Sequence, residues 1–149
     1  MAIAGQRGWH RYALALLLGA SAASAFAPLY LLPALPVGFT GLLWLLEDAP
    51  GWRRRFAIVW IFAWGHLIAS FYWIGFAFFV DAEAFGWLVP APVLGLPAFM
   101  ALFPAAMITL ALRFAPAGAP RALALGLGWA ASEWLRGHVL TGFPWNFVG

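Results

Sequence analysis

Long apolar stretches separated by short polar segments run through most of the chain. A helix that crosses the roughly 30 Å hydrocarbon core of a bilayer needs about 20 apolar residues. We expect helices over five stretches: residues 12–32, 34–46, 56–80, 87–112 and 122–140. The second is short and is either tilted or a hairpin partner of the first. The pattern therefore predicts an all-α, polytopic transmembrane helix bundle with about five crossings.

Composition favours lipid over water as the solvent of this chain. Hydrophobic residues make up 65% of it, charged residues only 9%, and the mean hydropathy is +0.90. A soluble domain carries about 25% charged residues. Ten Trp and fourteen Phe also argue against a disordered chain, which is poor in aromatic residues.

Charge placement predicts the orientation in the membrane. All eight basic residues are Arg, and seven of them lie between the apolar stretches, at positions 7, 11, 53, 54, 55, 113 and 121. With five crossings and a cytoplasmic N-terminus, all seven fall on the cytoplasmic side, while Asp81 and Glu83 fall outside. These short clusters do not form the wide cationic face that nucleic acid needs, so no nucleic-acid partner is expected.

The first stretch has a second interpretation. Arg7 and Arg11, followed by ALALLLGA and the small-residue run SAASAFA, resemble a signal peptide with an A-x-A cleavage site. We favour a retained helix because the apolar stretch continues through Leu32. Cleavage would leave the later helices oriented as before.

The last stretch contains ionisable residues that could carry chemistry. Each charged residue inside a membrane costs about 2.5–3.5 kcal/mol on insertion scales. Glu133 and Arg136 are three residues apart and share a helix face, so they can pair. They form either an ion pair that positions the helix end or a site that faces a polar cavity or lipid headgroups.

Other polar residues are weaker candidates. His66 is more readily explained as a histidine hydrogen-bonded between helices than as a proton carrier. His138, near Ser132 and Glu133, has the composition of a catalytic triad, but neighbours on one helix do not converge on one proton relay. We expect no metal site and no cofactor. The chain has no Cys and no Lys, which excludes thiol nucleophiles and Schiff-base chemistry.

A specific motif ends the chain. The sequence E-W-L-R-G at 133–137 is followed by Thr141, Gly142, Phe143, Pro144 and Trp145. Alone, the second half is typical of an anchored turn at a membrane surface. Together the halves resemble the signature E-[WF]-L-R-G-x3-T-G-F-P-W of the bacterial apolipoprotein N-acyltransferase family. Three further segments resemble family positions: F-A-P at 26–28, Y-W-I at 72–74 and A-L-F-P at 101–104.

The resemblance implies an enzyme of lipoprotein maturation in the bacterial inner membrane. Such enzymes transfer an acyl chain from a phospholipid to the N-terminal diacylglyceryl-cysteine of an apolipoprotein. The reaction passes through a thioester on a catalytic Cys, with a Glu base and a Lys that stabilises the oxyanion, in a nitrilase-like domain. That domain has no counterpart here, so residues 1–149 resemble only the N-terminal membrane region. We expect a truncated, inactive piece that binds or frames lipid.

Two alternatives to the acyltransferase interpretation stay open at this point. The chain could be a small multipass transporter or channel subunit in which His66, Glu133 and Arg136 line a polar path. It could also be a non-catalytic membrane scaffold that pairs helices with a partner. A reading frame that continues past Gly149 into a Glu–Lys–Cys domain would favour the enzyme.

Overall fold

The computed structural model describes residues 8–139, and every regular element in this range is helical. The all-α prediction is therefore confirmed for the described residues. The elements, in chain order, are α1 (Gly8–Ala23), α2 (Ala34–Glu47), α3 (Trp52–Phe71), the 3-10 helix η1 (Tyr72–Phe79), α4 (Ala82–Phe85), the 3-10 helix η2 (Gly86–Leu88), the π-helix η3 (Ala91–Gly95), α5 (Leu96–Met100), α6 (Leu102–Phe114) and α7 (Ala119–His138).

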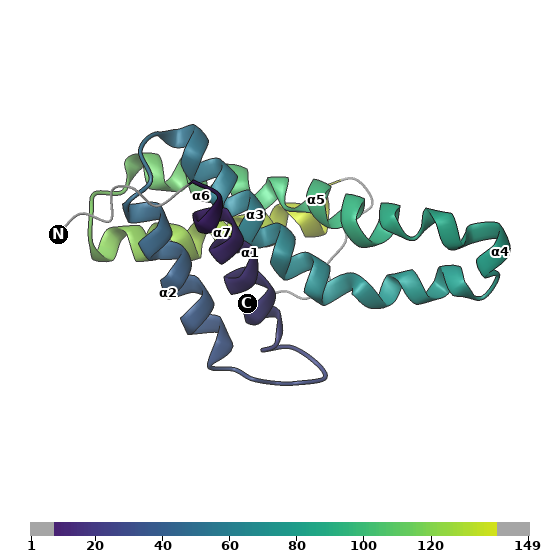
Figure 1. Ribbon diagram of the computed structural model, residues 1–149. Helices are drawn as coiled ribbons and strands as arrows, with labels where there is room; N and C mark the ends of the chain where they lie inside the picture. Colours follow the sequence, from purple (N-terminus) through teal and green to yellow (C-terminus); the bar gives the residue numbers. More distant parts are fainter. Residues whose placement is uncertain (1–7, 140–149) are drawn as a thin grey trace.

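A long antiparallel hairpin dominates the shape of the molecule (Figure 1). Its outgoing arm is α3 continued by η1, α4 lies at the tip, and η3, α5 and α6 return beside α3. The segments Trp52–Phe79 and Ala82–Phe114 are 28 and 33 residues long and apolar enough to cross a membrane by length and composition. These two apolar helices suggest that the chain associates with a membrane.

The returning arm is irregular where prolines interrupt it. Pro90, Pro92 and Pro97 lack the N–H that a regular helix needs, and the backbone forms a π-helical turn over Ala91–Gly95. Two tryptophans of α3 bind carbonyls of this stretch. The indole nitrogens of Trp60 and Trp64 donate to the carbonyls of Ala98 and Leu94, at 2.9 and 3.0 Å. These bonds fasten the irregular arm to the regular one.

The first helix differs from the sequence expectation, because it ends at Ala23 and not at residue 32. The hydroxyls of Ser21 and Ser24 donate to the carbonyls of Leu18 and Ser21, at 2.8 and 2.6 Å. Such side-chain bonds compete with the helical backbone pattern, and Pro28 cannot continue a helix. By contrast, α2 lies within one residue of the expected 34–46.

Glycines let the helices approach closely, which is the usual way for apolar helices to associate in membranes. A Cβ at Gly19 of α1 would lie 1.9 Å from the carbonyl oxygen of Phe62 in α3, and one at Gly65 would lie 2.4 Å from the carbonyl oxygen of Leu16. On α7, a Cβ at Gly128 would lie 2.8 Å from Cα of Ile108. Helix α3 therefore packs against α1 at backbone contact, and α6 packs against α7 in the same way.

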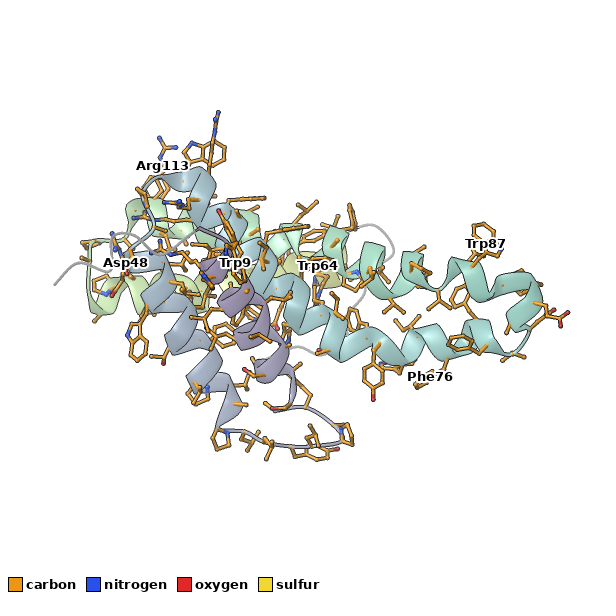
Figure 2. All side chains as sticks on the ribbon, viewed as in Figure 1. Trp9, Asp48, Trp64, Phe76, Trp87 and Arg113 are labelled. Carbon is orange, nitrogen blue, oxygen red and sulfur yellow. The ribbon has the colours of Figure 1, made fainter. Side chains whose placement is uncertain are left out.

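Three arginines from different helices lie at one end of the molecule. Arg11 donates to the carbonyl of Asp48 at 3.1 Å, and Arg55 donates to that of Ala49 at 3.2 Å. Figure 2 shows Asp48 and Arg113 at the end opposite the hairpin tip, near which Trp87 lies. Arg11, Arg55 and Arg113, which the sequence assigns to one membrane side, thus lie at one end of the fold, the arginine-rich end.

Candidate functional site

The second half of α7 carries a buried polar face. Trp129, Ser132, Glu133 and Arg136 follow the three- and four-residue spacing of a helix face. Their side chains are only 6, 3, 5 and 7% exposed, respectively. The prediction that Glu133 and Arg136 share a face is consistent with this placement, and Trp129 joins them one turn earlier.

Two short-range hydrogen bonds run along this face of α7, and one of them reaches the Glu133 carboxylate. The indole nitrogen of Trp129 donates to Oε1 of Glu133 at 2.8 Å, and the Ser132 hydroxyl donates to the Trp129 carbonyl at 2.7 Å. Glu133 and Arg136 attract each other electrostatically. A buried carboxylate is tolerated when it is hydrogen-bonded and lies near a positive charge; Trp129 donates a hydrogen bond to Glu133, and Arg136 supplies the nearby charge.

Aromatic rings from two other helices enclose Trp129. Its ring makes edge-to-face contacts with Phe39 of α2 and with Phe62 and His66 of α3, at centroid distances of 4.8, 6.1 and 5.5 Å. Such geometry adds stabilisation beyond burial alone. Trp129 therefore connects the polar face of α7 to the core of the bundle.

The side chain of His66 in α3 lies between helices, against Gly19 of α1 and Trp129 of α7. Its side chain is 0% exposed, and it contacts Phe26 edge-to-face at 5.7 Å. The ring faces the Gly19 backbone and lies close enough to Arg136 for an electrostatic interaction. Neither ring nitrogen reaches a partner with normal hydrogen-bond geometry among residues 8–139. Its observed contacts are thus mainly aromatic.

Among the remaining candidates, His138 does not join this cluster. His138 lies at the end of α7, where its ring stacks on Trp134 at 4.5 Å and Nδ1 lies 2.7 Å from the Trp134 carbonyl oxygen. It is exposed, unlike Glu133 and Arg136. The motif residues Thr141, Gly142, Phe143, Pro144 and Trp145 lie outside the described residues.

Sequence reasoning did not single out Trp129 as part of the site. A tryptophan inside an apolar stretch is ordinarily assigned to the core or to a membrane interface. The available signal was its position four residues before Glu133, which places the indole N–H on the same helix face as the carboxylate.

The chain is similar to known proteins over nearly its whole length. The family described as "Apolipoprotein N-acyltransferase N-terminal domain" matches residues 18–149. Relatives named apolipoprotein N-acyltransferase include those of Caulobacter vibrioides, 44% identical over 97% of this chain, and Rhodopseudomonas palustris, 42% identical over 95%. A relative from Brucella suis is 41% identical over 95%. The chain spans only 27–28% of the length of these relatives.

Proposed function

The chain belongs to the apolipoprotein N-acyltransferase N-terminal domain family, and from this premise we propose that it is the membrane part of such an enzyme. The complete protein would transfer an acyl chain from a phospholipid to the N-terminal diacylglyceryl-cysteine of an apolipoprotein. The observation that carries this proposal is the family match across residues 18–149, joined by identities near 40% to several relatives of that name.

The proposed division of labour follows from the side chains that the chain has and lacks. A thioester cannot form without a thiol, and residues 1–149 contain no Cys. The family resemblance implies that the acyl-transfer chemistry belongs to a nitrilase-like domain in the complete protein. The helices described here would hold that domain against the bilayer and provide a lateral path for substrates that carry lipid tails.

We place the chain in the bacterial inner membrane with five crossings and the arginine-rich end in the cytoplasm. The two hairpin segments, 28 and 33 residues long, exceed the roughly 20 residues that a crossing needs. Helices α1 and α2, with 16 and 14 residues, are about 24 and 21 Å long and thus shorter than the hydrocarbon core. The exposed apolar loop residues between them, Leu29 to Leu32, would extend this pair into the outer interface.

In this arrangement Glu133 and Arg136 lie near the outer end of α7, beside the entry for lipid. Arg136 is the group that would meet the phosphate of the acyl donor, because a guanidinium binds phosphate through charge-assisted hydrogen bonds. Its burial against Glu133 also supports a second role, in which the pair fixes the end of α7 ahead of the motif at 141–145.

A chimera tests the proposed function. Residues 1–149 replace the aligned N-terminal 28% of the Caulobacter vibrioides relative, and mass spectrometry measures N-acylation of a diacylated lipoprotein in cells depleted of their own enzyme. We expect the chimera to restore acylation, and the same chimera without its catalytic Cys to fail. A chimera that reaches the membrane at the parent level yet leaves the lipoprotein unacylated would contradict the proposal.

A further inference from the structure

A groove of about 430 Å³ runs between α2 and α7. Its α2 wall consists of Pro36, Phe39, Thr40 and Leu43. Its α7 wall extends from Ala122 to Glu133, eleven residues later. At 1.5 Å per helical residue this wall is about 16 Å long, about half the thickness of a bilayer hydrocarbon core.

Small residues on one face of α7 make the groove hollow. Ala122, Gly126 and Ala130 repeat every four residues and line it together. A Cβ at Gly126 would meet nothing within 4 Å, whereas one at Gly128 would meet the backbone of Ile108. The two glycines therefore serve opposite purposes: Gly128 allows tight contact with α6, while Gly126 leaves open space toward α2.

The groove opens onto an apolar outer surface. Val37 and Trp44 of α2 are 63 and 67% exposed, and Leu123 and Leu127 of α7 are 65 and 61% exposed. In the membrane placement proposed above, these side chains face lipid tails. A hollow lined by apolar side chains and open to hydrocarbon fills with hydrocarbon, because water would gain few hydrogen-bond partners there.

The groove is apolar at one end and polar at the other, as a lipid molecule is. The end at Ala122 and Leu43 is apolar, and the opposite end holds the Glu133 carboxylate with the Trp129 indole N–H bound to it. With the arginine-rich end in the cytoplasm, the polar end lies toward the outer headgroups. Acyl carbons would therefore lie along the alanines and glycine, and the ester and headgroup region near Glu133.

We propose that this groove binds one acyl chain of an outer-leaflet phospholipid. The inference rests on the membrane placement in the proposed function and adds a specific position for a lipid within it. The volume lies near the lower end of the range for small-molecule pockets, about 300–1,000 Å³. A further helix about 10 Å across would occupy about 1,250 Å³ over the same length of about 16 Å, so it could not enter a groove of about 430 Å³ and could only cover its opening.

Photolabelling of the reconstituted chain tests this inference. Vesicles contain a phosphatidylethanolamine with a diazirine in one acyl chain, and residue-level mass spectrometry locates the adducts. We expect labelling at Phe39 and Leu43, inside the groove, in addition to the outward-facing Val37 and Trp44. The Gly126→Leu variant adds bulk to the groove at a position where a Cβ would meet nothing within 4 Å, and it should lower labelling at Phe39 and Leu43 about tenfold, with Val37 and Trp44 unchanged.

Two further variants complete the test. Thr40→Phe fills the groove from the α2 wall and should give the same selective loss, so that the result does not depend on one substitution. Leu127→Phe adds bulk on the exposed face of α7 and should leave all labelling unchanged. Labelling at Phe39 and Leu43 that stays unchanged in both groove-filling variants would overturn the inference while leaving the membrane placement intact. If none of Phe39, Leu43, Val37 and Trp44 is labelled in the unmodified chain, both the inference and the membrane placement are overturned.

Discussion

The contact between α1 and α3 allows a quantitative prediction for Gly19→Ala. The new Cβ would lie 1.9 Å from the Phe62 carbonyl oxygen and 2.8 Å from its carbon, whereas ordinary contacts begin at 3.4 Å. Because the obstructing atoms are backbone, no side-chain rotation relieves the clash, and the two helices must separate locally by about 1.5 Å. A gap of 0.5–1 Å already removes roughly a quarter to a half of the dispersion attraction between facing atoms.

The expected magnitude combines this packing loss with helix propensity. Overpacking a well-packed core costs about 1–3 kcal/mol, and an alanine in a helix regains up to about 1 kcal/mol relative to glycine. Gly126→Ala on α7 is a matched control, because it gains the same propensity and its Cβ meets nothing within 4 Å. The two variants should therefore differ in unfolding free energy by about 1–3 kcal/mol, with Gly19→Ala the less stable.

The free energy of unfolding of both variants is measured by titrating the detergent-solubilised chains with a denaturing detergent while circular dichroism records the loss of helix. Helix content before titration verifies that each variant folds. Equal stability of Gly19→Ala and Gly126→Ala would refute the close approach of α1 to α3 on which the bundle core depends.

Further predictions concern the polar face of α7 and use the same titration unless stated. Trp129→Phe removes the indole donor and leaves the Glu133 carboxylate without that hydrogen bond, so it should lower the free energy of unfolding by about 1–3 kcal/mol. A change of only a few tenths of a kcal/mol would contradict the hydrogen bond. Arg136→Leu should lower the free energy of unfolding by about 3–5 kcal/mol, because it leaves the buried Glu133 charge without the opposite charge beside it. Adding Glu133→Leu removes that charge too and should recover part of the loss. If the effects of the two substitutions simply add, the two residues are not coupled. The free energy of unfolding of His66→Leu should stay within about 1 kcal/mol of that of the parent, because the substitution breaks no hydrogen bond of normal geometry within residues 8–139 and leucine buries no polar atom. A loss of stability above about 3 kcal/mol would mean that His66 has a polar partner. At the position aligned with Arg136 in a full-length relative, Arg→Ala should lower lipoprotein N-acylation about tenfold at matched membrane level; unchanged acylation would leave Arg136 only its structural role.

Sequence reasoning predicted those features that depend on local pattern. The helical class, the position of α2 and the shared face of Glu133 and Arg136 follow from apolar run length and from three-residue spacing. The end of α1 at Ala23 was missed because run length counts apolar residues, and two serine hydroxyls that bond to backbone carbonyls do not interrupt such a count.

Features that depend on how two helices pack against each other could not be predicted from the sequence. The sequence contains no G-x-x-x-G motif, yet single glycines such as Gly19 and Gly65 create backbone contacts between helices. The groove beside Gly126 could not be predicted either, because it exists only where α2 lies opposite that part of α7. A lone glycine in an apolar helix does not reveal whether it faces a backbone or an open space.

The absence of cysteine from the chain makes one topology measurement especially clean. Single cysteines replace Glu83 at the hairpin tip or Arg54 at the arginine-rich end, and spheroplasts are treated with a membrane-impermeant maleimide. We expect the Glu83→Cys chain to label in intact spheroplasts and the Arg54→Cys chain to label only after the membrane is opened. The reverse pattern, or equal labelling of both chains in intact spheroplasts, would contradict a membrane domain oriented with its arginines in the cytoplasm.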